Sequence, residues 1–374
     1  MTAAAWRNRP WAAGFLLWGL SCVAARGEML EWKGFLTAGY AQSDVRAATV
    51  DGIDKSPNVT SLTRLGLIGT LHLGNEWDLA AQFLARGRDS SNFAVGLEWG
   101  LVTWRPRSDT SLRLGKQRLP TWLVSDYIDT GALYPWVRPP SEIYGLIPVT
   151  SFTGAMLFHA VDLGGAWHLD LSVMAGGTVL TIRRGLVTYQ SKSDVVFVGG
   201  TAMLRTETAG VRVGYLRGKG AAEVTSIVDN PIVGTGSSTR IYTVTPVDLG
   251  TSQFLSLGAN LDWEDVVGYV ELASQINDNP NYKRNSAGYL TLGYHLKDRK
   301  FLPHVTFGRI FDAQGSGQAG LQTSVTPGLV YAVSSSLALK GEYSRIWTSG
   351  GAARFIDAPR ETASLWAFSV DAVF

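Results

Sequence analysis

Hydrophobic and polar residues alternate with a period of two over most of the chain. In the stretch 64–73, leucines recur at alternate positions, as Leu65, Leu67, Leu71 and Leu73, and mostly polar or small residues lie between them. A period of two is typical of a β-strand with one apolar and one polar face, whereas helices repeat every ~3.6 residues. The same alternation recurs to the last residue, and helical periodicity is almost absent. The pattern therefore predicts an all-β protein.

Sixteen segments show this alternation, and fourteen or eighteen strands are the alternatives. The predicted strands are 31–42, 61–73, 77–86, 93–104, 111–118, 151–160, 166–176, 194–205, 209–217, 252–263, 266–276, 286–296, 301–311, 321–333, 337–347 and 364–374.

The lengths of the connections give an independent test of this assignment. Odd-numbered strands are mostly followed by long connections, and even-numbered strands are followed by brief turns. The longest connections are 43–60, 119–150, 177–193, 218–251 and 348–363. Outer-membrane barrels have short turns at one end and longer loops at the other. We therefore predict a transmembrane antiparallel β-barrel of about sixteen strands, with both termini at the short-turn end.

The alternation also assigns side chains to the two faces of the wall. Outer-membrane strands turn apolar residues toward lipid and polar or small residues toward the lumen. On this basis the lumen wall carries Arg64, Arg86, Arg113 and Glu98. The same phase places Trp99 and Leu101 on the lipid face, and it places Trp104 and Tyr269 on the lumen face.

The N-terminus predicts export. Arg7 and Arg9 precede an uncharged run, 11–23, which is followed by small residues. That order is typical of a secretory signal peptide, and the run is shorter than the ~20 residues that a spanning helix needs. We assign 1–27 to the signal, with cleavage after Ala25 or Gly27, and 28–374 to the barrel. Cys22 leaves a lipoprotein signal as an alternative.

Removal of the signal changes the charge and the chemistry of the chain. The signal contains the only cysteine and three of the 33 Lys and Arg residues, so 30 basic residues face 31 acidic ones, for a net charge of −1. The mature chain can have no disulfide and no thiolate ligand. Nothing in the charge predicts a nucleic-acid partner.

Two stretches resemble a known family. The last strand, 364–374, alternates aromatic residues and ends on Phe374, as in the signal read by the barrel-assembly machinery. The stretch 113–120, Arg-Leu-Gly-Lys-Gln-Arg-Leu-Pro, leads into the 32-residue connection 119–150. Together with the topology of 28–374, they resemble the Gram-negative outer-membrane porin superfamily. The connection lacks the acidic Pro-Glu-Phe-Gly type of tip found in enteric general porins.

The resemblance implies a set of properties for this chain. It implies Sec-type export to the outer membrane, a third loop, 119–150, folded inward as a constriction, and passive diffusion of small hydrophilic solutes or ions. It also implies contact with outer-membrane lipid and lipopolysaccharide, and a homotrimer.

The connection 119–150 carries the candidate constriction residues. Pro135, Pro139 and Pro140 stiffen the backbone around Arg138. The acidic residues of the same connection are Asp126, Asp129 and Glu142. One interpretation is a charged constriction that filters solutes by size and sign, with a mild anion preference because of the wall arginines. The alternative is that Arg138 pairs with Glu142 or a wall residue and only fixes the loop.

The search for catalytic chemistry predicts no enzyme. The chain has no Gly-x-Ser-x-Gly, His-Glu-x-x-His or phosphate-binding loop, and its five histidines lack metal-ligand spacing. We therefore expect no catalytic residues, no metal and no cofactor. Two alternatives to a porin are a phospholipase-type barrel enzyme, for which His159 is the nearest candidate, and a structural or adhesive barrel.

Overall fold

The computed structural model describes residues 29–46, 49, 52–88, 90–147, 149–184, 189–231, 238–280, 283–314, 320–351, 353–355 and 362–374. The predicted signal peptide, 1–27, lies outside the described residues. The strands are β1 (Met29–Ser43), β2 (Arg64–Leu73), β3 (Trp77–Arg88), β4 (Ser90–Arg107), β5 (Thr110–Arg118), β6 (Ser151–Gly164), β7 (Trp167–Arg184), β8 (Tyr189–Arg205), β9 (Ala209–Pro231), β10 (Ser238–Trp263), β11 (Val266–Asn277), β12 (Arg284–Tyr294), β13 (Phe301–Gln314), β14 (Leu321–Ala332), β15 (Leu337–Ser349) and β16 (Thr362–Val373).

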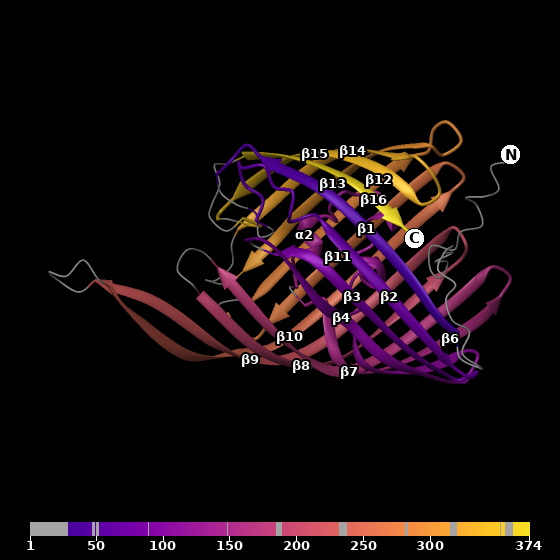
Figure 1. Ribbon diagram of the computed structural model, residues 1–374, viewed down its shortest axis with the longest axis horizontal. Coiled ribbons are helices and arrows are strands. Elements are labelled where there is room, and N and C mark those ends of the chain that lie inside the picture. Colours follow the sequence, from indigo (N-terminus) through magenta and orange to yellow (C-terminus); the bar gives the residue numbers. More distant parts are fainter. Residues whose placement is uncertain are drawn as a thin grey trace.

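These strands form one closed antiparallel barrel (Figure 1). Each strand pairs with its neighbours in chain order, and β1 pairs with β16, for example Thr37 with Asp371. Met29 pairs with His72, next to the turn between β2 and β3, and Phe374 exchanges backbone hydrogen bonds with Gly34. The first and last described residues therefore lie at the end with the short turns, here called the turn end. The opposite end is called the loop end.

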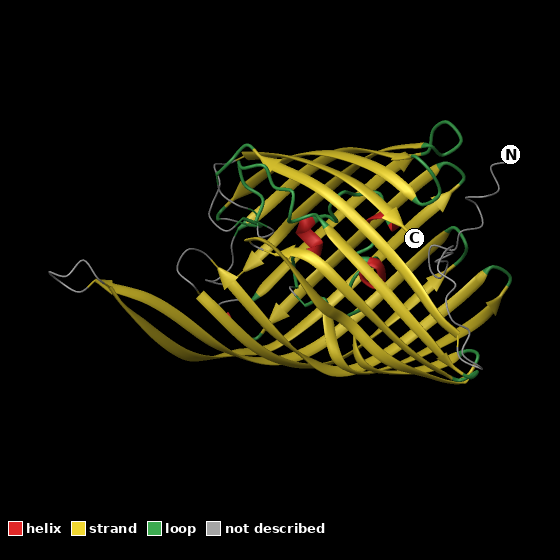
Figure 2. Ribbon diagram, in the orientation of Figure 1, coloured by secondary structure: helices red, strands yellow, loops and turns green. Residues whose placement is uncertain are grey.

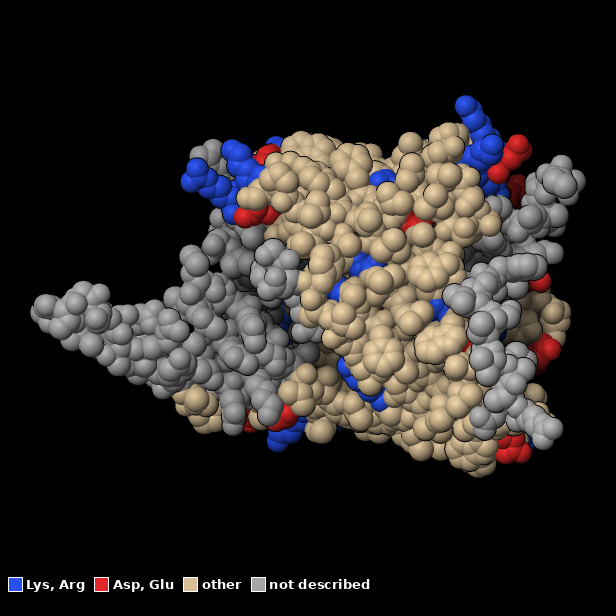
Figure 3. All heavy atoms as spheres, in the orientation of Figure 1, with Lys and Arg blue, Asp and Glu red and all other residues tan. Residues whose placement is uncertain are grey.

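Exposure alternates along the strands. In β13, Val305 and Phe307 are 45% and 46% exposed, whereas His304 and Thr306 are 6% and 4% exposed. A side-chain period of two turns the first pair outward and the second inward. On the face shown in Figure 3, charged side chains gather mainly at the two ends of the barrel, and the broad middle is mostly uncharged, with isolated charged side chains, mainly Lys and Arg, between the uncharged ones. An uncharged outer band is what a lipid environment requires.

The predicted all-β barrel of sixteen antiparallel strands is confirmed, with every strand in its predicted place in the order. The last strand shows the predicted phase, because Trp366, Phe368 and Phe374 are exposed. Among the described residues, no helix has the length and apolar character needed to cross a bilayer.

Two predicted loops are wrong over most of their length. One is 177–193, where β7 continues to Arg184 and β8 begins at Tyr189, and the two strands stay paired up to these residues. The other is the stretch 218–251, which was assigned to an external loop, but β9 continues to Pro231 and β10 begins at Ser238. The two strands stay paired from Ala209 with Leu261 up to Pro231 with Ser238, with one register shift near Asp248. This hairpin projects well beyond the rest of the loop end (Figure 1).

A β-bulge overturns part of the predicted face assignment. Leu97 pairs with Phe83 and Trp99 pairs with Gln82, so Glu98 is the extra residue of β4. Because side chains alternate between the two faces of a strand, one extra residue turns every later side chain of that strand to the opposite face. Trp99 therefore points inward, where its Nε1 donates to Gln82 Oε1 at 2.7 Å. Leu101 also turns inward.

The same shift turns Trp104 outward. It stacks on Trp77, with ring centroids 5.8 Å apart and an interplanar angle of 21°. The sequence-based placement of Trp99 and Leu101 on the lipid face and of Trp104 on the lumen face was thus wrong. Tyr269 does face inward, where it is buried.

The connection 119–150 contains short helices that lie within the outline of the barrel (Figure 2). They are η1 (Ser125–Tyr127), η2 (Gly131–Leu133) and α2 (Ser141–Tyr144). α2 contacts β11, β12 and β13, and η2 contacts β16 and β1. The apolar side chains of this segment form one buried cluster with inward residues of β6 to β13, including Phe152, Phe254, Tyr289 and Ile310. Because these residues cover one another, that side of the interior is dry.

Candidate functional site

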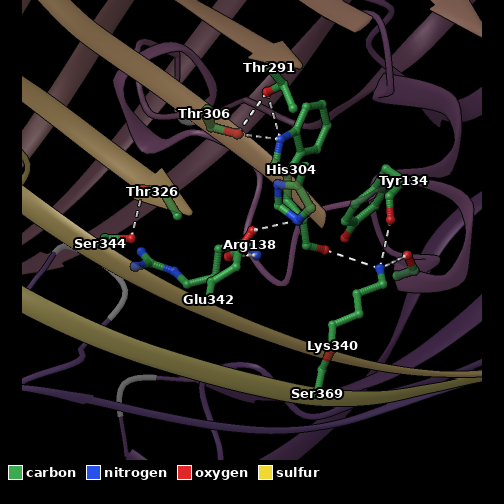
Figure 4. Close-up of polar contacts among 12 residues, drawn as sticks. Tyr134, Arg138, Thr291, His304, Thr306, Thr326, Lys340, Glu342, Ser344 and Ser369 are labelled. Atoms are coloured by element: carbon green, nitrogen blue, oxygen red, sulfur yellow. Dashed lines mark hydrogen bonds and ion pairs between the residues drawn. The ribbon is translucent and has the colours of Figure 1, made fainter. Parts of the chain in front are cut away.

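Segment 119–150 is held to the opposite wall by a buried lysine. Lys340 Nζ, on β15, donates to the carbonyl oxygens of Gly131 (2.6 Å), Tyr134 (2.7 Å) and Trp136 (3.1 Å). It also lies 3.3 Å from Asp371 Oδ2 of β16. The ammonium has three donor hydrogens and no acceptor, so it matches a group of convergent carbonyls. Figure 4 shows Lys340 reaching toward Tyr134.

A buried glutamate anchors two other parts of the segment. Glu271, on β11, accepts hydrogen bonds from the backbone N–H of Leu123 (2.7 Å) and from the Tyr144 hydroxyl (2.7 Å). The wall residue Tyr289 donates to the same carboxylate at 2.8 Å. Arg212, on β9, donates to the carbonyl oxygen of Trp122 at 2.7 Å.

Trp136 occupies the centre of the contact between segment and wall. Its Nε1 lies 2.9 Å from Thr291 Oγ1 and 3.1 Å from Thr306 Oγ1, and the side chain is 1% exposed. Its ring packs edge-on against Tyr289 at 5.4 Å and against Tyr269 at 4.9 Å. Each aromatic pair of this kind contributes about 0.5–1.5 kcal/mol beyond the area that it buries. These contacts fix the middle of the segment against β11–β13.

Four of the eight predicted site residues come together at the start of the segment. Arg118 Nη1 is 2.9 Å from Glu98 Oε1, and its Nη2 pairs with Asp129. Arg86 Nη2 is 3.3 Å from Glu98 Oε2, and Arg64 Nη1 is 3.9 Å from Asp129 Oδ1. We call these five residues the wall cluster. It links β2–β5 to segment 119–150, and Arg86 is its most exposed member, with 33% of its side chain accessible.

Tyr134 extends the wall cluster into the segment. Its hydroxyl accepts a hydrogen bond from Arg64 Nη2 at 2.7 Å and donates to the carbonyl oxygen of Ile128 at 2.9 Å. Burial raises the pKa of the Tyr134 phenol, so this donor stays protonated. The segment is therefore bound to β2 on one side and to β15 on the other.

Arg113 and Asp126 lie outside the wall cluster. Arg113 points inward from β5, is half-buried, and its guanidinium lies 5.7 Å from the centre of the Phe158 ring. Asp126, in η1, is exposed. Both are candidates for charges that meet a solute directly.

Arg138 and Glu142 each contact the wall of the barrel. Glu142 is buried, and its Oε1 accepts a hydrogen bond from Gln322 Nε2 at 2.7 Å. The backbone N–H of Arg138 donates to Glu342 Oε2 at 3.3 Å. Arg138, Glu142 and Glu342 line a cavity of about 40 Å³ with Thr326 and Ser344, and the Arg138 side chain extends toward the latter two (Figure 4). Of the two partners proposed for Arg138, Glu142 or a wall residue, the contact with Glu342 is one with the wall.

The charges on the two sides of the interior differ. On the side where the segment is anchored, the numbers of basic and acidic residues are equal. The basic residues are Arg138, Arg212, Lys340 and Arg354, and the carboxylates are Glu142, Glu271, Glu342 and Asp371. On the other side, the wall cluster with Arg113 and Asp126 has four guanidinium groups and three carboxylates. The inward Asp78 of β3 pairs with Arg105 of β4, so these two charges cancel and the net charge there is +1.

Sequence reasoning missed Arg118, Lys340 and Arg212. Lys340 and Arg212 occupy inward-facing strand positions, so the alternation could have identified them as interior cations. Arg118 ends β5 in the phase of the outward Leu114, so the alternation would have placed it on the lipid face. Lys340 and Arg212 bind mainly backbone carbonyls far away in the sequence, and no local pattern marks such partners.

The alternative candidate His159 lies near the turn end of β6. Its Nδ1 is 2.9 Å from Thr110 Oγ1, at the beginning of β5. A phospholipase-type site would need this histidine near the opposite rim. Within the described part of the chain, no group of three or more His, Cys, Asp or Glu residues is placed to hold a metal ion.

Comparison with known proteins gives matches at the level of structure. No protein-family model matches the chain, and no curated protein sequence matches it. OmpT of Vibrio cholerae is similar at a TM-score of 0.57 and 13% identity, over 95% of this chain and 100% of that chain. An anion-selective porin from Comamonas acidovorans gives 0.55 and 12%, over 93% and 100%. Salmonella typhi OmpF gives 0.56 and 14%, over 93% and 98%. The chain thus has the closed sixteen-strand fold of the outer-membrane porins, an architecture of the outer membrane.

Proposed function

We propose that this protein is an outer-membrane porin through which small hydrophilic solutes diffuse, with a mild preference for anions. The proposal rests on one observation: the β2–β5 side of the interior carries a net charge of +1 and includes the half-buried Arg113 and the partly exposed Arg86. Segment 119–150 packs against β11–β13 through apolar side chains and is joined to β2–β5 through the charged wall cluster. We therefore assign the route for solutes to the charged side, past Arg86 and Arg113. Interior charges of one sign favour counter-ions during permeation.

Several other features support this function. Segment 119–150 is fixed at both of its sides, as a constriction of constant size requires. The chain has a porin fold, and one of the similar structures is described as anion-selective. A homotrimer and the predicted contacts with lipopolysaccharide and the barrel-assembly machinery belong to the same proposal.

Reversal potentials across planar bilayers test the proposal. In a KCl gradient, the purified protein is expected to form steady openings whose reversal potential shows chloride preference. Arg113→Gln should lower that preference because it removes a cation that faces the interior. Arg217→Gln, an exposed position on the outer face of β9, is the matched control and should leave selectivity unchanged.

Two results would overturn the proposal. A preference for cations in the unmodified protein would contradict the anion assignment. A barrel that inserts without conducting would contradict the pore itself, and lipase activity of such a barrel would favour the alternative enzyme.

A further inference from the structure

The bulge in β4 turns an indole into the interior, one residue after the glutamate that binds the most accessible arginine of the wall cluster. Glu98 and the next residue, Trp99, both point into the interior. Glu98 Oε2 lies 3.3 Å from Arg86 Nη2, so the guanidinium binds the residue that directly precedes the tryptophan. A third of the Arg86 side chain remains accessible. Without the bulge, Trp99 would face lipid.

The hydrogen bonding of Trp99 fixes its ring and leaves it half-exposed. Its only polar atom donates to Gln82 Oε1 at 2.7 Å, so the indole needs no further polar partner. Among the described residues, no other aromatic ring packs against it, in contrast to Trp77, Trp104, Trp122 and Trp136. A fixed, half-exposed indole in a wet interior is a surface on which a planar apolar group can stack.

Arg86 supplies the complementary polar contact. Among the described residues its one ion pair uses one Nη atom, and a guanidinium has five N–H donors, so donors remain for a carboxylate in the lumen. The cations of the wall cluster outnumber its carboxylates by three to two, which disfavours a cationic ligand. A hydroxylated sugar would find one indole but no series of aromatic residues.

We infer that Trp99 and Arg86 form a weak binding site in the lumen for aromatic carboxylates. The aromatic ring stacks on the indole, and the carboxylate pairs with the guanidinium. This inference rests on the proposed function, because the ligand must reach the site through the pore. It adds a preferred class of solute to a route that otherwise selects only by size and charge.

Transient block of the single-channel current by benzoate tests the inference. Benzoate is expected to block at lower concentration than acetate, which lacks the ring, and than benzamide, which lacks the charge. Trp99→Ala should raise the half-blocking benzoate concentration about tenfold, the equivalent of one aromatic contact. Trp99→Phe should keep most of the block, and Arg86→Gln should reduce benzoate and acetate block together.

Trp104→Ala is the matched control, since it removes the outward indole five residues away on the same strand. Benzoate should block this variant at the same concentration as the unmodified protein. Equal block by benzoate and acetate, or equal effects of Trp99→Ala and Trp104→Ala in a conducting channel, would refute the binding site while leaving the porin function intact. Absence of conductance in the unmodified protein would instead refute the proposed function.

Discussion

Lys340→Met removes the ammonium that joins three carbonyls of segment 119–150 to the wall. The methionine keeps the length of the side chain but leaves Asp371 without its cation and the carbonyls of Gly131, Tyr134 and Trp136 without their donor. Breaking one buried ion pair typically costs about 3–5 kcal/mol. Asp371 keeps hydrogen bonds from Thr37 and Ser369, which limits the loss.

If the free energy that holds the segment to the wall falls by about 4 kcal/mol, the fraction of molecules in which the segment is detached rises roughly a thousandfold, since each ~1.4 kcal/mol is a factor of ten. The strand ladders do not depend on Lys340, so the barrel itself should remain folded. We therefore expect single channels that insert normally but show larger and more frequent fluctuations of conductance. Recordings in planar bilayers, with heat-modifiable migration in gels as the check on folding, measure both properties.

The matched control is Lys219→Met, which makes the same change at an exposed position of β9. The double variant Lys340→Met/Asp371→Asn removes both charges and should be quieter than Lys340→Met alone, because no buried carboxylate is left unpaired. Channels of Lys340→Met that are as quiet as those of Lys219→Met would refute the anchoring role. So would a double variant noisier than the single one.

Further predictions concern the wall cluster, the aromatic contact and the hairpin. Glu98→Gln removes one of three carboxylates from the β2–β5 side, so reversal potentials should shift toward chloride, and a shift toward potassium would contradict the charge assignment. Trp136→Phe loses one buried donor and should lower the free energy of unfolding by about 1 kcal/mol, whereas Trp136→Ala should lower it by about 3–5 kcal/mol. Denaturant titration measures both changes, and equal losses would exclude packing as the main contribution of Trp136. Arg138→Ala should alter conductance or selectivity if Arg138 meets the solute, and unchanged values would leave it as a residue that only fixes the segment. Replacing 227–242 by Asn-Gly should leave folding and conductance unchanged, because the retained Ser226–Thr243 pair can close as a hairpin; a barrel that fails to fold would show that the projecting strands stabilise it.

The barrel was predictable because the information that defines it is local. Alternation marks each strand, and turns such as the one between Leu73 and Trp77 follow from the spacing of the strands. The extended hairpin was missed because its strands carry polar and β-branched residues, such as Thr225 and Thr243, which do not give the contrast between lipid and lumen faces. The bulge at Glu98 was missed because one inserted residue changes the phase without changing the composition.

The site was predictable only in part. Arg64, Arg86, Glu98 and Asp129 were selected from phase and position, and the structure joins them through Arg118. Glu142 or a wall residue was the proposed partner of Arg138, and the sequence could not name the wall residue: barrel closure brings Glu342 to Arg138 and Gln322 to Glu142. Contacts created by closure depend on the register of strands up to 200 residues apart, and the sequence alone does not specify that register.

The position of the Lys340 anchor has a consequence for the time course of assembly. Its components come from β15, β16 and β1, and Thr37 and Asp371 face each other across the β1–β16 seam. A half-built sheet lacks this junction, so segment 119–150 has no complete attachment until the first and last strands meet. In the proposed porin, the width of the passage is therefore set by the same event that seals the wall, and an unsealed intermediate does not yet possess a finished filter.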